Sequence, residues 1–100
     1  MSKAFLLVYS DALGSREQIK QWANTSPLIS MWRYDLPSCF YLVSDATADE
    51  ITIEIQSCLT KNGRFIVAEI SGSKCQGWLT DDSWYLINNL ELKPTQSKST

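Results

Sequence analysis

The three cysteines have the most reactive side chains of this sequence. They are widely spaced and form no CxxC pair, and their odd number argues against a disulfide framework and a structural zinc site. We therefore expect Cys39, Cys58 and Cys75 to be free thiols. The sequence contains no histidine, which removes Ser-His-Asp and Cys-His catalysis as well as zinc sites that use histidine.

Contacts to phosphate or to nucleic-acid bases are the next chemistry to consider. Arg33 and Tyr34 could contact a phosphate and a stacked base, but rim and cross-strand contacts explain them better. The loop from Gly72 to Gly77 lacks the Lys-Ser/Thr ending of a P-loop. The net charge is −2, so only a local basic patch would favour a nucleic-acid partner. No cofactor motif is present, and we predict no cofactor.

The elements that must position these residues follow from periodicity and capping signals. Ser15 with Gln18, and Thr47 with Glu50, have the spacing of capping boxes that begin two helices. The segment Asp35 to Ser38 predicts the turn of an aromatic hairpin. The predicted strands are residues 4–9, 29–34, 39–44 and 64–71, with a helix after the first strand, a helix after the third, and a last helical segment over 81–90.

This order of elements predicts an α+β fold, the ferredoxin-like βαββαβ sandwich. It has a four-stranded antiparallel sheet, two helices on one face and a short C-terminal helical segment. We expect residues 1–90 to form a single domain and the polar residues 91–100 to form a disordered tail. No apolar run reaches the roughly 20 residues of a membrane span, and the N-terminus lacks a signal-peptide cleavage site. A cytoplasmic protein without membrane contact is the expectation.

The predicted sheet carries apolar side chains on both faces. An antiparallel sheet with one wet face shows apolar and polar residues in alternation, and residues 4–9, 39–44 and 65–70 largely do not. Two helices cover one face only, so the C-terminal segment, a second copy of the chain, or both must cover the other. We predict a homodimer joined through the helix-free face. Its predicted interface residues are Leu7, Phe40, Leu42, Phe65, Val67, Trp78 and Trp84.

Four stretches of the chain together resemble a known family. They are FLLVYSD, ISMWRYDLPSCFYLVSD, TADEITIEIQSCLTKNGRFIVAEISG and GWLTDDSWYLINN, which cover about residues 4–90. The chain resembles the small ferredoxin-fold proteins labelled SinR-like, relatives of the CRISPR-associated small endoribonuclease family of spacer acquisition. The resemblance implies a ferredoxin-like protomer and a homodimer formed across the open sheet faces.

The resemblance also implies a divalent-metal site at Asp11. In the nuclease relatives an aspartate that ends the first strand has a divalent-metal role, and Asp11 is the matching residue; the metal would be Mg²⁺ or Mn²⁺. Here Ser10 separates Tyr9 from Asp11, which turns the carboxylate to the other face unless a bulge compensates. Two hypotheses follow: a non-enzymatic homodimer for assembly or partner binding, and a metal-dependent endonuclease acting on RNA or DNA with Asp11 as catalytic metal ligand.

Overall fold

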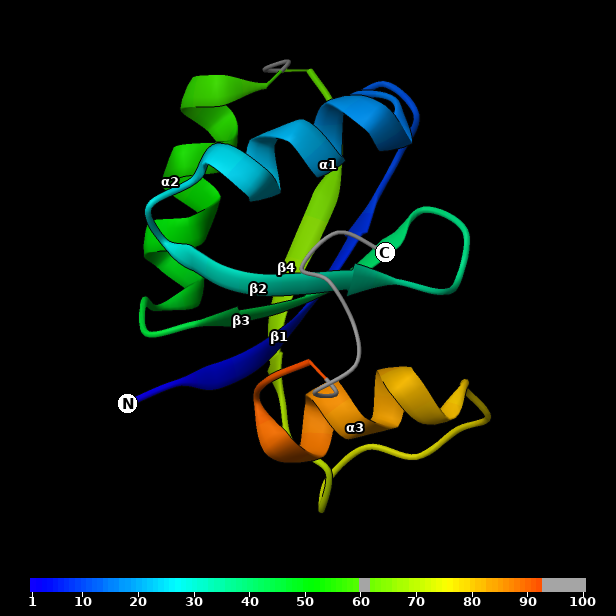
Figure 1. Cartoon of the computed structure of the whole chain (residues 1–100). Helices are drawn as coiled ribbons and strands as arrows, with labels where there is room; N and C mark the ends of the chain where they lie inside the picture. The colour runs from blue at the N-terminus through cyan, green and yellow to red at the C-terminus, as the bar shows by residue number, and fades with distance from the viewer. Residues whose placement is uncertain (60–61, 93–100) are drawn as a thin grey trace.

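A computed structural model describes residues 1–59 and 62–92 of the chain. It contains one antiparallel four-stranded sheet with the strand order β2-β3-β1-β4, and three helices (Figure 1). This arrangement confirms the predicted α+β, ferredoxin-like order of elements. The elements are β1 (Lys3–Tyr9), α1 (Arg16–Thr25), β2 (Ile29–Tyr34), β3 (Cys39–Ser44), α2 (Ala48–Cys58), β4 (Phe65–Ile70) and α3 (Asp81–Asn89).

Both predicted capping boxes are present. The Ser15 hydroxyl accepts from the backbone N–H of Gln18, and the Gln18 side chain accepts from the backbone N–H of Ser15. Thr47 and Glu50 make the same reciprocal pair at the start of α2. Each box satisfies backbone donors that a helix start otherwise leaves unpaired, which explains why these two helices begin where the sequence indicates.

Helices α1 and α2 lie on one side of the sheet and form the main core with it (Figure 1). Trp32 and Phe40 are fully buried at the centre of this core, and Ile19 and Ile55 reach it from the two helices. The full set of buried members is Phe5, Leu7, Tyr9, Leu13, Ile19, Trp22, Ala23, Ile29, Trp32, Phe40, Leu42, Ile51 and Ile55.

Five of the residues predicted for the dimer interface belong to this helix-covered face, so the interface prediction was wrong at these positions. Three are completely buried members of the main core, and two are half-buried and pack against it. They are Leu7, Phe40 and Leu42, and Phe65 and Val67. Because β1 and β3 are apolar on both faces, alternation separates two sets of side chains without showing which set meets the helices.

Strict alternation also fails at the start of β2. The register shifts between Ile29 and Met31, where an irregularity interrupts the pairing with β3. An extra residue at such a point reverses the faces of the strand residues after it. Ile29 therefore packs in the main core together with Trp32, whereas Met31 packs on the opposite side of the sheet.

Two details of α2 and the segment after it differ from the sequence interpretation. Periodicity places Cys58 in the apolar stripe of the helix, but its side chain is exposed. Ile53, on the outer face, is 63% exposed. The sequence also indicates a glycine stop at Gly63. A Cβ at Gly63 would clash with the Leu13 backbone, so this glycine permits close packing of two loops. Residues 60–61 lie outside the described part of the chain.

Among residues 1–59 and 62–92, no helix has both the length and the apolar character that crossing a membrane would require. All three cysteines are free, as predicted. Of the predicted tail, only Glu91 and Leu92 are described, and Leu92 packs against apolar residues beneath α3. Residues 93–100 lie outside the described range.

Candidate functional site

Helix α3 lies on the side of the sheet opposite α1 and α2, where it covers part of the second face (Figure 1). Its buried residues Leu86 and Ile87 pack on the side chains that β3 directs to this face. Those β3 residues are Cys39, Tyr41 and Val43. The C-terminal segment therefore covers the β2–β3 half of the second face, which was one of the alternatives left open by the sequence.

A set of hydrogen bonds, which we call the α3 clasp, holds the start of α3 to the β2–β3 hairpin. The Asp35 carboxylate accepts from the backbone N–H of Thr80 at 3.1 Å and from the Ser83 hydroxyl at 2.9 Å. The Thr80 hydroxyl also donates to Asp35, and Arg33 Nε donates to the Ser83 hydroxyl at 2.9 Å. Asp35 thus caps α3 from another element, and the N-cap residue Thr80 makes no side-chain capping bond of its own.

The clasp makes the charged form of Asp35 favourable. The backbone N–H of Thr80 is the largest cause that lowers the pKa of Asp35, partial burial opposes it, and the hydroxyls of Ser83 and Thr80 with the Arg33 charge lower it further. A carboxylate whose pKa is lower in the folded state stabilises the fold above its ordinary pKa. This contribution disappears as the pH falls through the folded-state value.

We predict that Asp35→Ala lowers the free energy of unfolding at pH 7 by about 1–2 kcal/mol, because the hydrogen bonds are charge-assisted but partly exposed. The difference from wild type should shrink as the pH is lowered from about 5 to about 3. Urea unfolding of both proteins at several pH values measures this difference in stability. The control is Asp11→Ala, which removes an exposed turn aspartate and should change the free energy of unfolding little. A loss that stays constant down to pH 3 would contradict the assigned role of the carboxylate.

Helix α3 leaves one end of the β1–β4 half of the second face uncovered, whereas at the other end Ala4 is buried and Ile70 packs against the apolar cluster that contains Leu86 and Ile87. At the uncovered end Val8 is 39% and Ile66 is 62% exposed, and the two are paired neighbours in the β1–β4 register. Leu36 in the hairpin turn is 47% exposed, and Trp78 in the loop before α3 is 96% exposed. We call this surface the open patch and define it as Leu6, Val8, Leu36, Ile66, Ala68 and Trp78.

An apolar pocket of about 240 Å³ lies beside the open patch, between the sheet, the loop before α3 and α3 itself. Trp78 and Leu36 border it, and Tyr41, Trp84 and Ile87 belong to its wall. The remaining lining residues are Leu6, Ile70, Cys75, Gln76, Gly77 and Leu79. Trp78 and Trp84, the last two predicted interface residues, therefore both lie on the second face of the sheet.

Two polar groups on this face are held neutral. Burial, followed by the negative charge of Asp35, raises the pKa of the Cys39 thiol to about 11. Burial also raises the pKa of Tyr41 far above its ordinary value, and Cys39 and Asp35 add to the effect. The Tyr41 hydroxyl is buried and has no hydrogen-bond partner among the described residues. A neutral thiol is a poor nucleophile, so these groups suit binding better than covalent chemistry.

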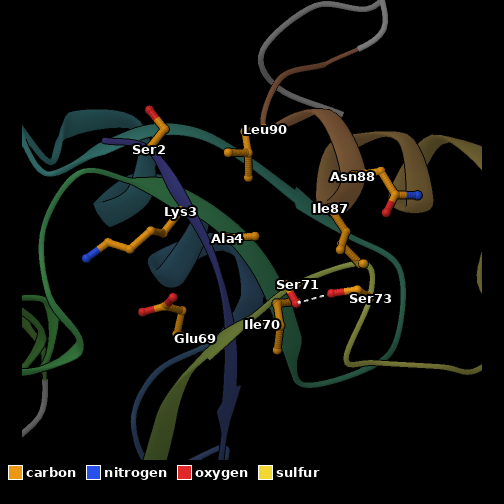
Figure 2. A pocket seen from close by; sticks show the side chains of 11 residues that line it. Ser2, Lys3, Ala4, Glu69, Ile70, Ser71, Ser73, Ile87, Asn88 and Leu90 are labelled. Carbon is orange, nitrogen blue, oxygen red and sulfur yellow. Dashed lines mark hydrogen bonds between the residues drawn. The ribbon is translucent and has the colours of Figure 1, made fainter.

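A second hollow, of about 350 Å³, lies at the other end of α3 (Figure 2). Figure 2 shows the side chains of Lys3 and Glu69 pointing away from α3, so neither charge is directed at the helix. Gly72 lies so close to Asn88 that a Cβ at this position would clash with the side-chain amide. The loop after β4 is in close contact with α3 at this hollow, and the two charged residues of its lining, Lys3 and Glu69, extend away from the helix.

Asp11 lies in the exposed turn after β1. Ser10, the residue that separates it from Tyr9, continues the pairing of β1, because its N–H donates to the Arg64 carbonyl at 2.9 Å. Within the described part of the chain, no three Asp, Glu, Cys or His side chains converge as a metal site. A metal at Asp11 would therefore need ligands from a second copy, a substrate or water, and this role stays a prediction of the resemblance.

The sequence reasoning missed the pairing of the α3 clasp, whose members are about 45 residues apart along the chain. The only signal was the carboxylate of Asp35 in a turn and two hydroxyls at the start of a helix. Comparison with known proteins adds no further constraint. No protein-family model, no curated protein and no solved structure matches this chain.

Proposed function

We propose that this chain is a non-enzymatic assembly module that pairs with a second copy of itself through the open patch. The observation that carries the proposal is the cluster of large apolar side chains on a sheet face that α3 only half covers, above all Trp78 at 96% exposure. Scattered apolar residues are ordinary on a protein surface, but a contiguous group indicates an interaction site.

The size of the patch supports pairing. A tryptophan side chain buries about 150–250 Å² when it is covered. With Ile66, Leu36 and Val8, the open patch offers on the order of 500 Å² of apolar surface. A standard interface takes about 800 Å² from each partner, so the patch would be its apolar centre and the neighbouring polar residues its rim.

A second copy is the partner that fits this surface best. The six residues of the open patch carry no charge, so two copies can bring these side chains together without like-charge repulsion. A two-fold interface uses one self-complementary surface, and the open patch contains both a protruding side chain and a neighbouring pocket. The resemblance to SinR-like proteins also implies a homodimer.

The groups that meet on the second face support binding over catalysis. They are apolar side chains, a neutral thiol and a neutral hydroxyl, which recognise apolar surface and offer no acid or base near neutral pH. The metal-dependent endonuclease alternative depends on Asp11 and on the resemblance, and no contact of the described residues adds to it.

A pair of matched variants tests the proposal. Wild type should sediment at twice 11.3 kDa, and Ile66→Asp should sediment at 11.3 kDa, because the charge would be buried without a partner. Ile53→Asp is the control: it changes an isoleucine of nearly equal exposure, 63% against 62%, on the outer face of α2. Sedimentation velocity from about 100 µM to about 1 µM covers the relevant affinities.

The proposal would be wrong if wild type stays at the monomer mass at every concentration. It would also be wrong if both aspartate variants dissociate equally, since the interface would then not be confined to the open patch. Circular dichroism of each variant shows whether a change of mass reflects unfolding.

A further inference from the structure

We infer that Trp78 specifies the pairing: the indole of each copy enters the apolar pocket beside Trp78 of the other copy. This inference rests on the proposed homodimer and names the contact that would hold it together. It assigns an occupant to the pocket and a role to Trp78, a large apolar side chain that is 96% exposed.

Trp78 protrudes from a loop that is held on both sides. Before it, the Cys75 thiol donates to the Ser71 carbonyl at 2.9 Å, and after it, Thr80 is bound to Asp35 through both its N–H and its hydroxyl. Trp78 itself stays 96% exposed. Because the loop is anchored, its backbone loses little additional freedom when a partner covers Trp78.

The pocket has the size and chemistry for an indole ring. Its volume of about 240 Å³ is enclosed mainly by apolar side chains. Trp84 in its wall offers an aromatic surface for stacked or edge-to-face contact.

The arrangement suits a two-fold axis. Trp78 lies at the rim of the pocket that it would fill in the other copy. A rotation about an axis through the open patch therefore places each indole opposite the other pocket, and one contact occurs twice per dimer. Buried tryptophans at the centre of an interface commonly contribute most of the binding energy.

Acrylamide quenching of tryptophan fluorescence tests the contact. Trp22 and Trp32 are buried in the main core, so the difference between wild type and Trp78→Phe reports mainly on Trp78. At low concentration this difference signal should be readily quenched, and at high concentration it should be shielded and shifted to shorter wavelength. Trp78→Ala should weaken dimerisation at least about ten-fold, as expected for a central interface residue.

A mixing experiment tests reciprocity. Trp78→Ala removes the indole and keeps the pocket, whereas Leu36→Arg puts a long charged side chain at the pocket mouth and keeps the indole. Neither variant should dimerise well alone. Their mixture restores one indole in one open pocket, so it should form a mixed dimer more tightly than either variant pairs with itself.

The outcomes separate this inference from the proposed function. A wild-type chain that is monomeric at all concentrations overturns both. A dimer in which Trp78 stays quenchable, or a mixture with no gain over the separate variants, overturns only the inference. Shielding of Trp78 that does not depend on concentration also overturns it, because each indole would then occupy the pocket of its own chain.

Discussion

Phe40→Ala is expected to lower the free energy of unfolding by about 3–5 kcal/mol, as large-to-small changes of buried aromatic residues do. Phe40 is completely buried in β3. Its ring centroid lies 5.6 Å from that of Trp32, 5.5 Å from that of Tyr34 and 6.0 Å from that of Tyr9. The substitution removes one member from all three aromatic pairs and leaves a cavity beneath α1 and α2. Chemical denaturation followed by circular dichroism measures the loss.

Ile66→Ala is the matched control, since Ile66 lies on the second face of the same sheet and is mostly exposed. In the monomer it should change the free energy of unfolding by less than about 1 kcal/mol. This pair of variants also tests the correction to the predicted interface. If Phe40→Ala dissociated a dimer without destabilising the protomer, the ring would belong to an interface and not to the core.

The element order could be predicted from the sequence because its signals are local. Capping boxes at Ser15 and Thr47 and the turn after Tyr34 act within a few residues along the chain. A right-handed crossover then leaves few topologies for strands and helices in this order. These signals correctly predicted the seven elements and the antiparallel sheet.

The faces of the sheet could not be predicted in the same way. Val8 and Leu7 are both apolar, yet Leu7 is buried under the helices and Val8 is exposed. Alternation fixes only that neighbours point to opposite sides. Where both sets are apolar, helix packing decides which set is covered, and this depends on contacts between residues that are distant in sequence. The shift between Ile29 and Met31 adds a reversal that no local signal marked.

The candidate site, like the fold, could be predicted only in part. Trp78 and Trp84 were predicted to lie in an interface on the helix-free face, and both line the apolar pocket on the second face. The hydrogen bonds of Arg33 and Asp35 to the start of α3 depend on how the hairpin meets that helix. Such contacts arise only once the helix is docked on the sheet.

Leu86→Ala should show how much the packing of α3 on its own sheet contributes to the stability of the fold. Leu86 is fully buried against the second face, and its truncation is expected to lower the free energy of unfolding by about 2–5 kcal/mol. Asn88→Ala, at an exposed position on the same helix, should cost less than about 1 kcal/mol. Urea unfolding of the two variants compares the buried and exposed sides of α3 directly.

The same variant should make Cys39 accessible. Cys39 lies beneath α3 with a pKa of about 11, so at pH 8 only about one thiol in a thousand is the reactive thiolate. Cys58 is exposed and serves as the internal reference for labelling with a thiol reagent. In wild type Cys58 should react first and Cys39 slowly, and Leu86→Ala should accelerate Cys39 while leaving the rate of Cys58 unchanged. If Cys39 stays protected while stability falls, α3 remains docked and the loss is confined to a cavity beneath it. If Cys39 reacts quickly already in wild type, α3 leaves its own sheet in solution, and the open patch then extends over the whole second face.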